Sequence, residues 1–332
     1  MRFGSITLDD ALGAILAHSV QTAAGPLRKG QWLGADAIAA LRADGRSEVI
    51  VARLEPGDLH EDEAATRIAA ALVPDPVEQG LRVTKAATGR VNLHATGRGV
   101  LAVDAAAVDA LNAVNPMMTL ATVQPWFRAD PDAMVATVKI ISYAVPAADV
   151  DRAVGLIGPA LRLMPPIYTR AALIETTITN RDPPVKGRSV MVGRLDRLGV
   201  TLAPRIVAAH ATVPLAAAIA GVASDVQVIF ILTASATSDP DDVAPAAVRA
   251  AGGQVAQFGI PVDPGNLLFL GSLGDRPVIG LPGCARSPAL NGADWVMERV
   301  ICGVPVGPAD LARMGVGGLL TEIPTRPRLR EA

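Results

Sequence analysis

The chain has 332 residues, of which 50% are hydrophobic and only 3% are aromatic. This length allows one large core or, more naturally, two or three smaller ones, built mainly from Ala, Val, Leu and Ile. Such a composition favours Ala-rich helices packed on Val- and Ile-rich strands, which is the α/β class. A formal net charge of −2 gives no overall positive field, so we expect no nucleic-acid partner.

The sequence also bears on the compartment. Asp9 and Asp10 precede any long apolar run, which argues against a secretory signal. The most apolar stretch, residues 213–236, contains polar residues near its middle, so we expect a helix followed by a strand and no membrane span. Cys284 and Cys302 provide neither a disulfide framework nor a zinc pattern. We therefore expect a cytoplasmic protein.

Residues 1–75 are expected to form an N-terminal α+β domain. Apolar residues at helical spacing predict a helix over 8–20, and a second amphipathic helix is predicted over 35–44. Alternation predicts a strand over 47–54, and an Ala-rich pattern predicts a helix over 61–72. Two prolines follow that helix and indicate a domain boundary.

Residues 76–165 are expected to form a β-rich middle domain. Its predicted elements are strands at 90–93, 99–103 and 133–145 and helices at 105–112 and 147–161. The Pro165-Pro166 pair then indicates a hinge.

From residue 168 the pattern alternates between strand and helix. We predict strands at 171–179, 205–210, 226–233, 255–258, 266–270 and 276–280, and helices at 185–198, 213–220, 243–251 and 288–301. This alternation predicts, for residues 168–303, a three-layer α/β/α domain with a mostly parallel sheet. Residues 304–332 are expected to form a C-terminal extension that ends in a basic, solvated tail from Thr325.

Three loops of this last domain are candidates for a binding site, because ligands of open parallel sheets bind beyond the carboxyl ends of the strands. The first loop, 233–242, carries four hydroxyls that suit phosphate oxygens, on Thr233, Ser235, Thr237 and Ser238. A capped turn from strand to helix would have the same sequence.

The end of the first loop carries acidic residues. Asp239 is expected to cap the following helix, with Pro240 at its first position. Asp241 and Asp242 are suited either to hold a magnesium ion or to complement the helix dipole.

The second loop, 261–266, is predicted to be a rigid Pro-Gly corner that offers Asp263, Gly265 and Asn266. The third loop, 281–288, is predicted to turn from a strand into a helix. It offers Pro282, Gly283, Arg286 and Ser287 for binding a phosphate or carboxylate.

Three further residues have both a functional and a structural interpretation. Cys284 lies near a predicted helix N-terminus, which favours a thiolate, although a free cysteine is also a common small core residue. Lys186 begins the 185–198 helix and is placed to meet an anion or simply to be solvated. His210 ends a predicted strand and would either border the site or be a satisfied histidine at the edge of the core.

In this order and spacing the three loops resemble the molybdopterin-binding domain of molybdopterin molybdenumtransferases and adenylyltransferases. The pattern of that family runs from a buried strand into Thr-Gly-Gly with a following Asp, then to Pro-Gly with flanking lysines, then to Leu-Pro-Gly-Asn-Pro. This chain has Thr233-Ala234-Ser235 with Asp242, Asp263-Pro264-Gly265-Asn266 and Leu281-Pro282-Gly283-Cys284-Ala285.

A longer stretch of the chain is similar to the molybdopterin-binding half of bifunctional molybdenum cofactor cytidylyltransferases. The stretches that carry this likeness begin at Leu27, Gly259, Leu281, Asn291 and Met314. The resemblance then spans nearly the whole chain, without the nucleotidyltransferase half.

The departures from the family pattern weaken the case for catalysis. Ala234 and Ser235 replace glycines, and Asp263 and Asn266 stand where the family has lysines. Metal insertion and phosphoryl chemistry need positive groups and a metal-holding carboxylate to stabilise developing charge. The scaffold therefore indicates binding of a pterin more strongly than turnover.

The leading hypothesis from the sequence is a binder or carrier of molybdopterin or molybdenum cofactor in the biosynthesis or maturation of that cofactor. Phosphate would be held by Arg286, Ser235 and Thr237, and magnesium by Asp242, while Cys284 would touch molybdenum or carry sulfur. One alternative is an active molybdenumtransferase or adenylyltransferase that uses Lys186, Asp242 and Asp263. Another is a non-catalytic partner of a cytidylyltransferase or apo-molybdoenzyme. A homo-oligomer is also expected, from relatives of this fold.

Overall fold

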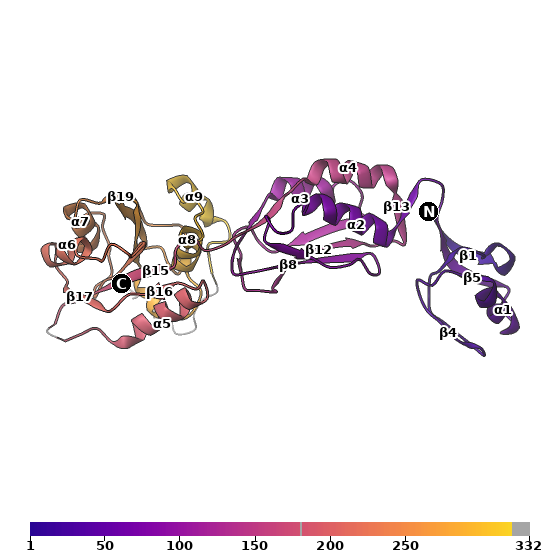
Figure 1. Cartoon of the computed structure of the whole chain (residues 1–332), viewed down its shortest axis with the longest axis horizontal. Helices are drawn as coiled ribbons and strands as arrows, with labels where there is room; N and C mark the ends of the chain where they lie inside the picture. The colour runs from indigo at the N-terminus through magenta and orange to yellow at the C-terminus, as the bar shows by residue number, and fades with distance from the viewer. Residues whose placement is uncertain (180, 321–332) are drawn as a thin grey trace, which may run out of the picture. The chain divides into compact units, whose positions relative to one another are not determined.

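A computed structural model of the chain describes residues 1–179 and 181–320. It divides into two compact units, Met1–Gly97 with Leu101–Leu163, and Arg98–Val100 with the chain from Met164 onward. The tail predicted from Thr325 lies outside the described residues. Each unit is described by itself below (Figure 1).

The beginning of the first unit is a small antiparallel sheet with one helix. Strands β1 (Arg2–Thr7), β5 (Glu48–Arg53) and β2 (Ile15–Leu16) pair in the order β1-β5-β2, and helix α1 (Ala35–Ala43) packs beside them. The helix predicted over 8–20 is wrong. Only Leu8–Asp10 forms a 3₁₀ turn, and Gly13 at φ +73° starts a change of direction into β2. The apolar spacing reflected burial of turn and strand residues in this lobe.

The rest of the first unit is a second layered α+β arrangement. Its four-stranded antiparallel sheet has the order β10 (Met118–Thr122), β12 (Met134–Ile140), β8 (Arg90–Ala95) and β7 (Leu81–Val83). Helices α2 (Glu61–Leu72), α3 (Ala105–Asn112) and α4 (Ala147–Ile157) lie along one side of this sheet (Figure 1).

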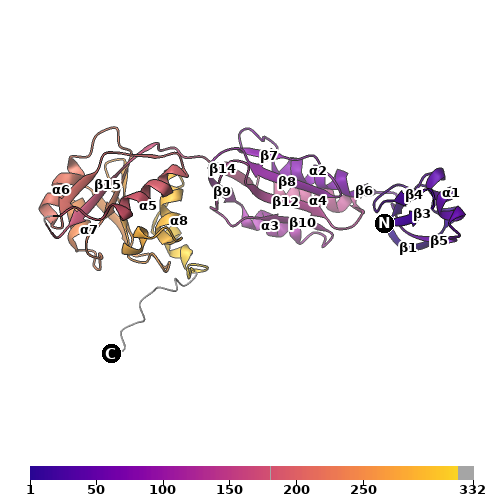
Figure 2. The same ribbon diagram turned by 90° about the horizontal axis from the view of Figure 1, so that it is seen from below.

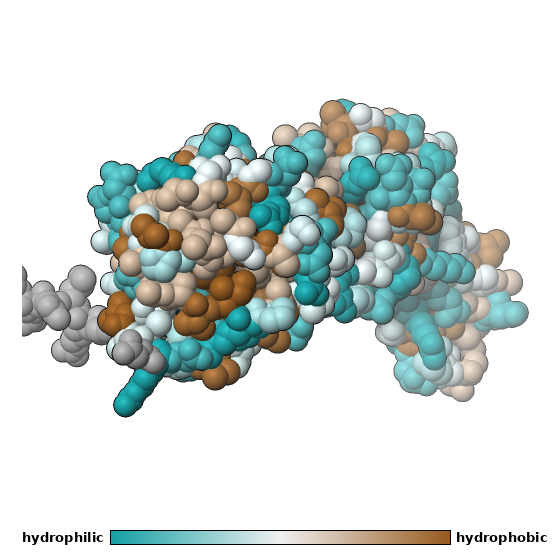
Figure 3. Space-filling view, turned by 60° about the vertical axis from the view of Figure 1, so that its left-hand side comes forward, coloured by the Kyte–Doolittle hydropathy of each residue, from teal (hydrophilic) through white to brown (hydrophobic). Residues whose placement is uncertain are grey.

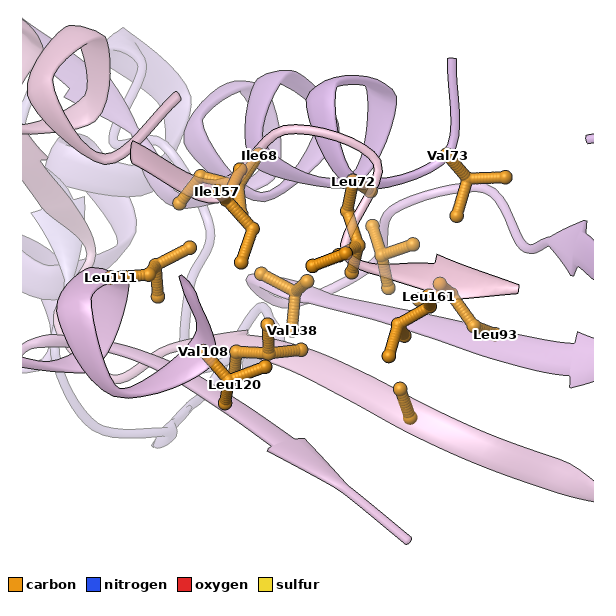
Figure 4. Packing of buried hydrophobic residues seen from close by; sticks show 14 of the residues in the cluster. Ile68, Leu72, Val73, Leu93, Val108, Leu111, Leu120, Val138, Ile157 and Leu161 are labelled. Atoms are coloured by element: carbon orange, nitrogen blue, oxygen red, sulfur yellow. The ribbon is translucent and has the colours of Figure 1, made fainter. Parts of the chain in front are cut away.

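The core of this region lies between the sheet and these helices. Figure 4 shows Ile68 and Leu72 of α2 directed toward Val138 of β12 and Leu93 of β8, all of them buried. Helix α2 begins and ends where the sequence predicts, but it packs with this sheet and not with the N-terminal lobe to which the sequence assigned it.

The first unit has further short strands, each of two to five residues. They are β3 (Val20–Thr22), β4 (Gly25–Leu27), β6 (Asp58–His60), β9 (Gly99–Val103, which crosses into the second unit), β11 (Arg128–Ala129), β13 (Ala144–Pro146) and β14 (Leu161–Met164).

The second unit is built around one mixed sheet. Its order is β16 (Thr201–Leu202), β15 (Arg170–Thr177), β18 (Val228–Leu232), β21 (Arg276–Leu281), β20 (Phe269–Leu273) and β19 (Gln254–Phe258), and β17 (Ile206–Ala209) also pairs with β15. All the pairs from β16 and β17 to β21 are parallel, whereas β20 and β19 are antiparallel additions at one edge. The sheet is therefore mixed: the parallel part expected from the sequence runs from β16 and β17 to β21, and β20 with β19 forms an antiparallel edge.

Helices cover this sheet because its central strands are apolar on both faces. All five residues of β18 are buried. Helices α6 (Thr212–Ala220) and α7 (Val243–Ala250) share a core with Ile229 and Ile231, and they lie side by side in Figures 1 and 2. The remaining helices are α5 (Val185–Asp196), α8 (Gly292–Ile301) and α9 (Pro308–Ala312).

One side of the second unit is drawn in Figure 3, where brown apolar residues and teal hydrophilic residues both reach the surface. No helix within the described residues is both long enough and apolar enough to cross a bilayer.

Candidate functional site

A pocket of about 580 Å³ opens in the second unit at the carboxyl ends of three parallel strands. Glu175 of β15 is in register with Leu232 of β18, and Leu232 is in register with Leu281 of β21, so these strand ends are level across the sheet. The residues that line the pocket are Glu175, Thr176, Thr177, Ile178, Thr179, Arg181, Asp182, Pro183, Pro184, Lys186, Gly187, Leu232, Ala234, Gly283, Cys284, Arg286 and Ser287. The chain thus places a cavity where parallel α/β sheets bind ligands.

An ion pair between Arg205 and the buried Glu175 supports one wall of the pocket. The carboxylate of Glu175, only 1% exposed, accepts hydrogen bonds from Arg205 Nε (2.8 Å) and Nη2 (3.2 Å). Arg205 Nη2 also donates to the carbonyl oxygen of Pro183 (2.6 Å), which fixes the segment that leads into α5. The hydrogen bond with Glu175 raises the pKa of Arg205, so this guanidinium stays charged. The pair holds this wall in position, and both carboxylate oxygens of Glu175 accept hydrogen bonds.

A hydroxyl joins three chain segments at the floor of the pocket. Thr176 Oγ1 accepts a hydrogen bond from the amide of Ala234 (2.7 Å) and lies 3.0 Å from His210 Nδ1. The amide of His210 donates to the carbonyl oxygen of Thr177 (2.8 Å). The first loop is therefore held to the end of β15 through Thr176, and His210 packs behind the lining.

Helix α5 points its first turn into the pocket. No side chain caps this helix, and its first turn holds no acidic residue. Gly187 is buried, and a Cβ there would lie 3.0 Å from Leu232 Cδ2, so the glycine lets the helix approach β18 closely. Lys186 and Arg181 are exposed and line the pocket, and the described residues give neither an ion-pair partner. Uncapped amides and two cations together favour an anion here.

The third loop is held in place by one buried arginine. Arg194 of α5, 7% exposed, donates from Nη1 to the carbonyl of Ala285 (2.7 Å) and from Nη2 to that of Ser287 (2.8 Å). Its Nε donates to Asp294 Oδ1 (2.5 Å), and Asp294 also completes the capping box of α8. The loop is therefore braced between α5 and α8, and Gly283, Cys284, Arg286 and Ser287 face the pocket.

Arg286 is half-buried and already has an internal partner. Its Nη2 donates to the carbonyl oxygen of Thr233, which joins the third loop to the first. Burial lowers the pKa of Arg286, and the nearby Glu175 carboxylate partly offsets this by favouring the charged form. Arg286 thus contributes positive charge to the pocket and also builds its wall.

Cys284 does not have the environment of a thiolate. Burial raises its pKa, more than the backbone hydrogen bond and Arg194 lower it, and Asp263 and Asp294 add to the rise. The sequence interpretation of a helix N-terminus that activates this thiol is therefore wrong, because only a short 3₁₀ turn, Gly283–Arg286, begins there.

The first loop is more structural than the sequence suggested. Thr233 and Thr237 are buried with their hydroxyls 3.5 Å apart, and Ser235 and Ser238 are exposed. Only Ala234 of this loop lines the pocket.

Asp242 has a capping role. It is the N-cap of α7, where its Oδ1 accepts from the amide of Val243 (2.6 Å) and its Oδ2 from that of Ser238 (3.1 Å). The prediction that Asp239 caps this helix is wrong, because Asp239 instead starts the preceding turn by accepting from the amide of Asp241. Among residues 1–179 and 181–320, no cluster of three or more His, Cys, Asp or Glu side chains suits a metal ion.

The second loop lies outside the pocket lining. The carbonyl of Pro264 accepts from the amide of Gly292 (2.8 Å), and Asp263 pairs through its backbone with residues 318–320. Gly265 is at φ +133°, and a Cβ there would lie 2.5 Å from the amide nitrogen of Gly292. Asn266 is exposed. This loop supports the N-terminus of α8, and the structure joins only the first and third loops in one pocket.

Sequence reasoning missed several residues that build the pocket. Glu175 and Thr176 fall inside a segment predicted only as a strand, and Arg194 and Arg205 were not singled out. One signal was available, since a carboxylate in an otherwise apolar strand needs a buried partner. The identity of that partner depends on tertiary structure.

Comparisons with known proteins find one family model and several distant solved structures. A family described as a domain of unknown function, DUF8806, matches residues 5–53. No curated protein matches the chain. Solved structures with some likeness include a molybdopterin biosynthesis moeA protein from Pyrococcus horikosii (15% identity, TM-score 0.33, 91% of this chain and 75% of that chain).

Two other solved structures are similarly distant. A molybdenum cofactor biosynthesis protein B has 17% identity and a TM-score of 0.29, over 42% of this chain and 91% of that chain. A molybdenum cofactor biosynthesis protein from Pyrococcus furiosus has 10% identity and a TM-score of 0.23, over 94% of this chain and 65% of that chain. TM-scores this low do not establish a shared arrangement, so the functional argument rests on the chain's own residues.

Proposed function

We propose that this protein binds molybdopterin or molybdenum cofactor in the pocket at the ends of β15, β18 and β21, and acts as a binder or carrier in the biosynthesis or maturation of that cofactor. The observation that carries the proposal is the pocket itself. It brings the third loop, the main chain of the first loop and the N-terminus of α5 together around one cavity.

The size and chemistry of the pocket support an anionic heterocycle of this kind. Its volume of about 580 Å³ falls within the range of small-molecule sites. Lys186 and Arg181 provide positive charge at the rim, and Arg286 provides it within the wall. Leu232 and Ile178 provide apolar surface for a ring system. In this proposal the phosphate lies at the first turn of α5 and the pterin extends toward Ala234 and Gly283.

Binding is better supported than turnover because the acidic residues nominated for catalysis have structural roles. Asp242 caps α7 and does not line the pocket, so it does not fit a magnesium ion bound beside the ligand. Asp263 belongs to the loop that supports α8. Lys186 remains as a cation for binding. The pocket lining also holds two carboxylates, but Glu175 is bonded to Arg205 through both oxygens, so the alternative of an active molybdenumtransferase or adenylyltransferase would have to use the exposed Asp182.

The proposal is tested by identifying the small molecule that remains bound when the protein is purified from a host that makes molybdopterin. We expect a pterin with the mass and fluorescence of molybdopterin or its oxidation product. Lys186→Gln should reduce the amount retained several-fold. Arg276→Gln is the matched control, because Arg276 begins β21 at the opposite end of the strand and bonds to the carbonyls of Val222 and Ala223.

A protein that carries no pterin, or equal retention in the Lys186→Gln and wild-type proteins, would refute the assignment of this pocket. Release of a nucleotide-linked product after addition of magnesium and ATP, or of a molybdenum-loaded product after molybdate is added as well, would favour the enzyme alternative.

A further inference from the structure

Thr176 is a buried residue of the pocket lining, and its hydroxyl contacts the titratable ring of His210. Thr176 is 1% exposed, and its Oγ1 accepts from the amide of Ala234 at 2.7 Å. Its second partner is His210 Nδ1 at 3.0 Å. His210 is the only histidine of the chain after residue 94.

The protonation state of His210 Nδ1 determines what the Thr176 hydroxyl can offer to a ligand. A threonine hydroxyl has one proton and two lone pairs, and Ala234 occupies one lone pair. While Nδ1 of His210 is unprotonated, the hydroxyl proton is donated to that nitrogen. When the imidazole is protonated, both ring nitrogens carry protons, and Nδ1–H donates to the second lone pair of Oγ1. The hydroxyl proton must then turn elsewhere.

We propose that protonation of His210 turns the Thr176 hydroxyl into a donor toward the pocket, so that an anion binds more tightly when His210 is charged. His210 acts here as a positioning residue behind the lining, and Thr176 is the group that meets the ligand. The inference rests on the proposed function only in that the ligand is anionic. By linkage, binding of the anion takes up a proton at His210.

Other charged groups lie near Thr176 and in the pocket lining. The carboxylate of Glu175, the residue before Thr176, is held by Arg205. Helix α6, which begins two residues after His210, has no ionisable side chain. The other charged groups that line the pocket are Arg181, Asp182, Lys186 and Arg286. Histidine is the one side chain whose ordinary titration falls between about pH 5 and pH 8.

The experiment uses sulfate as the probe, because the charge of sulfate does not change between about pH 5 and about pH 8. Sulfate affinity is measured on the full chain by NMR titration of the Ala234 and Gly187 amide signals. We expect binding at about pH 5 to be about fivefold or more tighter than at about pH 8. In His210→Asn the side-chain oxygen still accepts from Thr176 but does not titrate, so affinity should remain at the weak, high-pH value. His94→Asn is the matched control and should keep the wild-type dependence.

We call the turning of the Thr176 hydroxyl on protonation of His210 the switch. Two further measurements distinguish its effect on anion binding from the effect of the added charge of His210 alone. Thr176→Val should lose most of the pH dependence, and Thr176→Ser should retain it. Nitrogen-15 shifts of the His210 ring in the wild-type protein should show Nδ1 unprotonated at about pH 8, a readout that does not depend on how any variant folds. A protonated Nδ1 in the neutral ring, or full pH dependence in His210→Asn or Thr176→Val, would overturn the inference.

The outcomes also distinguish this inference from the proposed function. Sulfate that binds equally at both pH values refutes the switch and leaves the anion pocket intact. A protein that purifies without any pterin refutes the proposed ligand, whereas the pH dependence of sulfate binding would stand. Sulfate that binds at neither pH refutes the switch.

Discussion

Two loops with similar sequences have different roles in this protein. Residues 281–287 and 261–266 each place a Pro-Gly pair after a strand or at a turn, and the sequence nominated both as ligand loops. The third loop, around residues 281–287, lines the pocket with Gly283, Cys284, Arg286 and Ser287. The second loop, residues 261–266, packs against the N-terminus of α8 and residues 318–320.

A Pro-Gly turn therefore indicates a rigid corner of the chain but not which part of the protein that corner faces. The third loop follows β21, a central parallel strand, so its residues emerge at the ligand-binding end of the sheet. The second loop precedes β20, an antiparallel strand, and its position depends on the start of α8. The two loops therefore differ in role because one follows a central parallel strand and the other precedes an antiparallel strand.

The largest expected effect comes from removing the arginine that holds the third loop. Arg194→Met should lower the free energy of unfolding by about 3–5 kcal/mol, because the Asp294 carboxylate and the loop carbonyls would be left buried without their donor. Urea unfolding measures this loss.

Arg313→Ala is the control for Arg194, because the Arg313 side chain is 73% exposed and pairs with Asp310 at the surface. It should cost at most about 1 kcal/mol. Equal effects of the two substitutions would show that Arg194 does not brace the loop.

A pair of glycine substitutions tests the two loops directly. Gly265→Ala should destabilise the protein by about 1–3 kcal/mol, because its Cβ would lie 2.5 Å from the amide nitrogen of Gly292 at a φ of +133°. Gly283→Ala should be tolerated, since the nearest atom to its Cβ would be Arg286 Nη1 at 3.6 Å. The comparison of the loops fails if Gly283→Ala destabilises the fold as much as Gly265→Ala.

A smaller effect is expected at alkaline pH from Cys302, which is fully buried. Burial raises the pKa of its thiol from 9.0 to about 12. Below pH 9 the thiol is neutral in both states, and above it the unfolded thiol ionises first, so stability falls as pH rises toward 12. Wild type should lose about 1 kcal/mol more than Cys302→Ala between about pH 8 and about pH 10. Equal losses in the two proteins would contradict the raised pKa.

Cys284 provides a related but weaker test of the pocket. Because its pKa is raised, alkylation should be slow at neutral pH and should accelerate only as the pH passes above the usual range of a thiol. Bound pterin should slow the reaction further, since Cys284 lines the cavity. Mass spectrometry of the alkylated protein measures both rates, and rapid alkylation at neutral pH would contradict the burial of this thiol.

Local patterns predicted much of the second unit and of helix α2. The alternation of strand and helix from residue 170 onward is present, and the helix over 61–72 has the predicted bounds. The helix over 8–20 failed because apolar residues at helical spacing also suit a turn that buries them in a small lobe. The antiparallel strands β19 and β20 could not be distinguished from parallel ones by composition alone.

The site could be predicted only in part. The third loop and Lys186 were nominated from local sequence, and both line the pocket. Glu175 with Arg205, Thr176 with His210, and Arg194 with the third loop are pairs that are distant in sequence, and their hydrogen bonds arise from strand order and helix packing. No spacing rule connects such partners.

The proposed function requires that one pocket, lined by the third loop and not by the second, holds the ligand. Hydrogen–deuterium exchange can be compared between pterin-loaded and emptied protein. Slower exchange on loading is expected at the first turn of α5 and at residues 283–287, with residues 261–266 unchanged. Protection confined to residues 261–266, or absent from both the first turn of α5 and residues 283–287, would show that the ligand does not bind in this pocket.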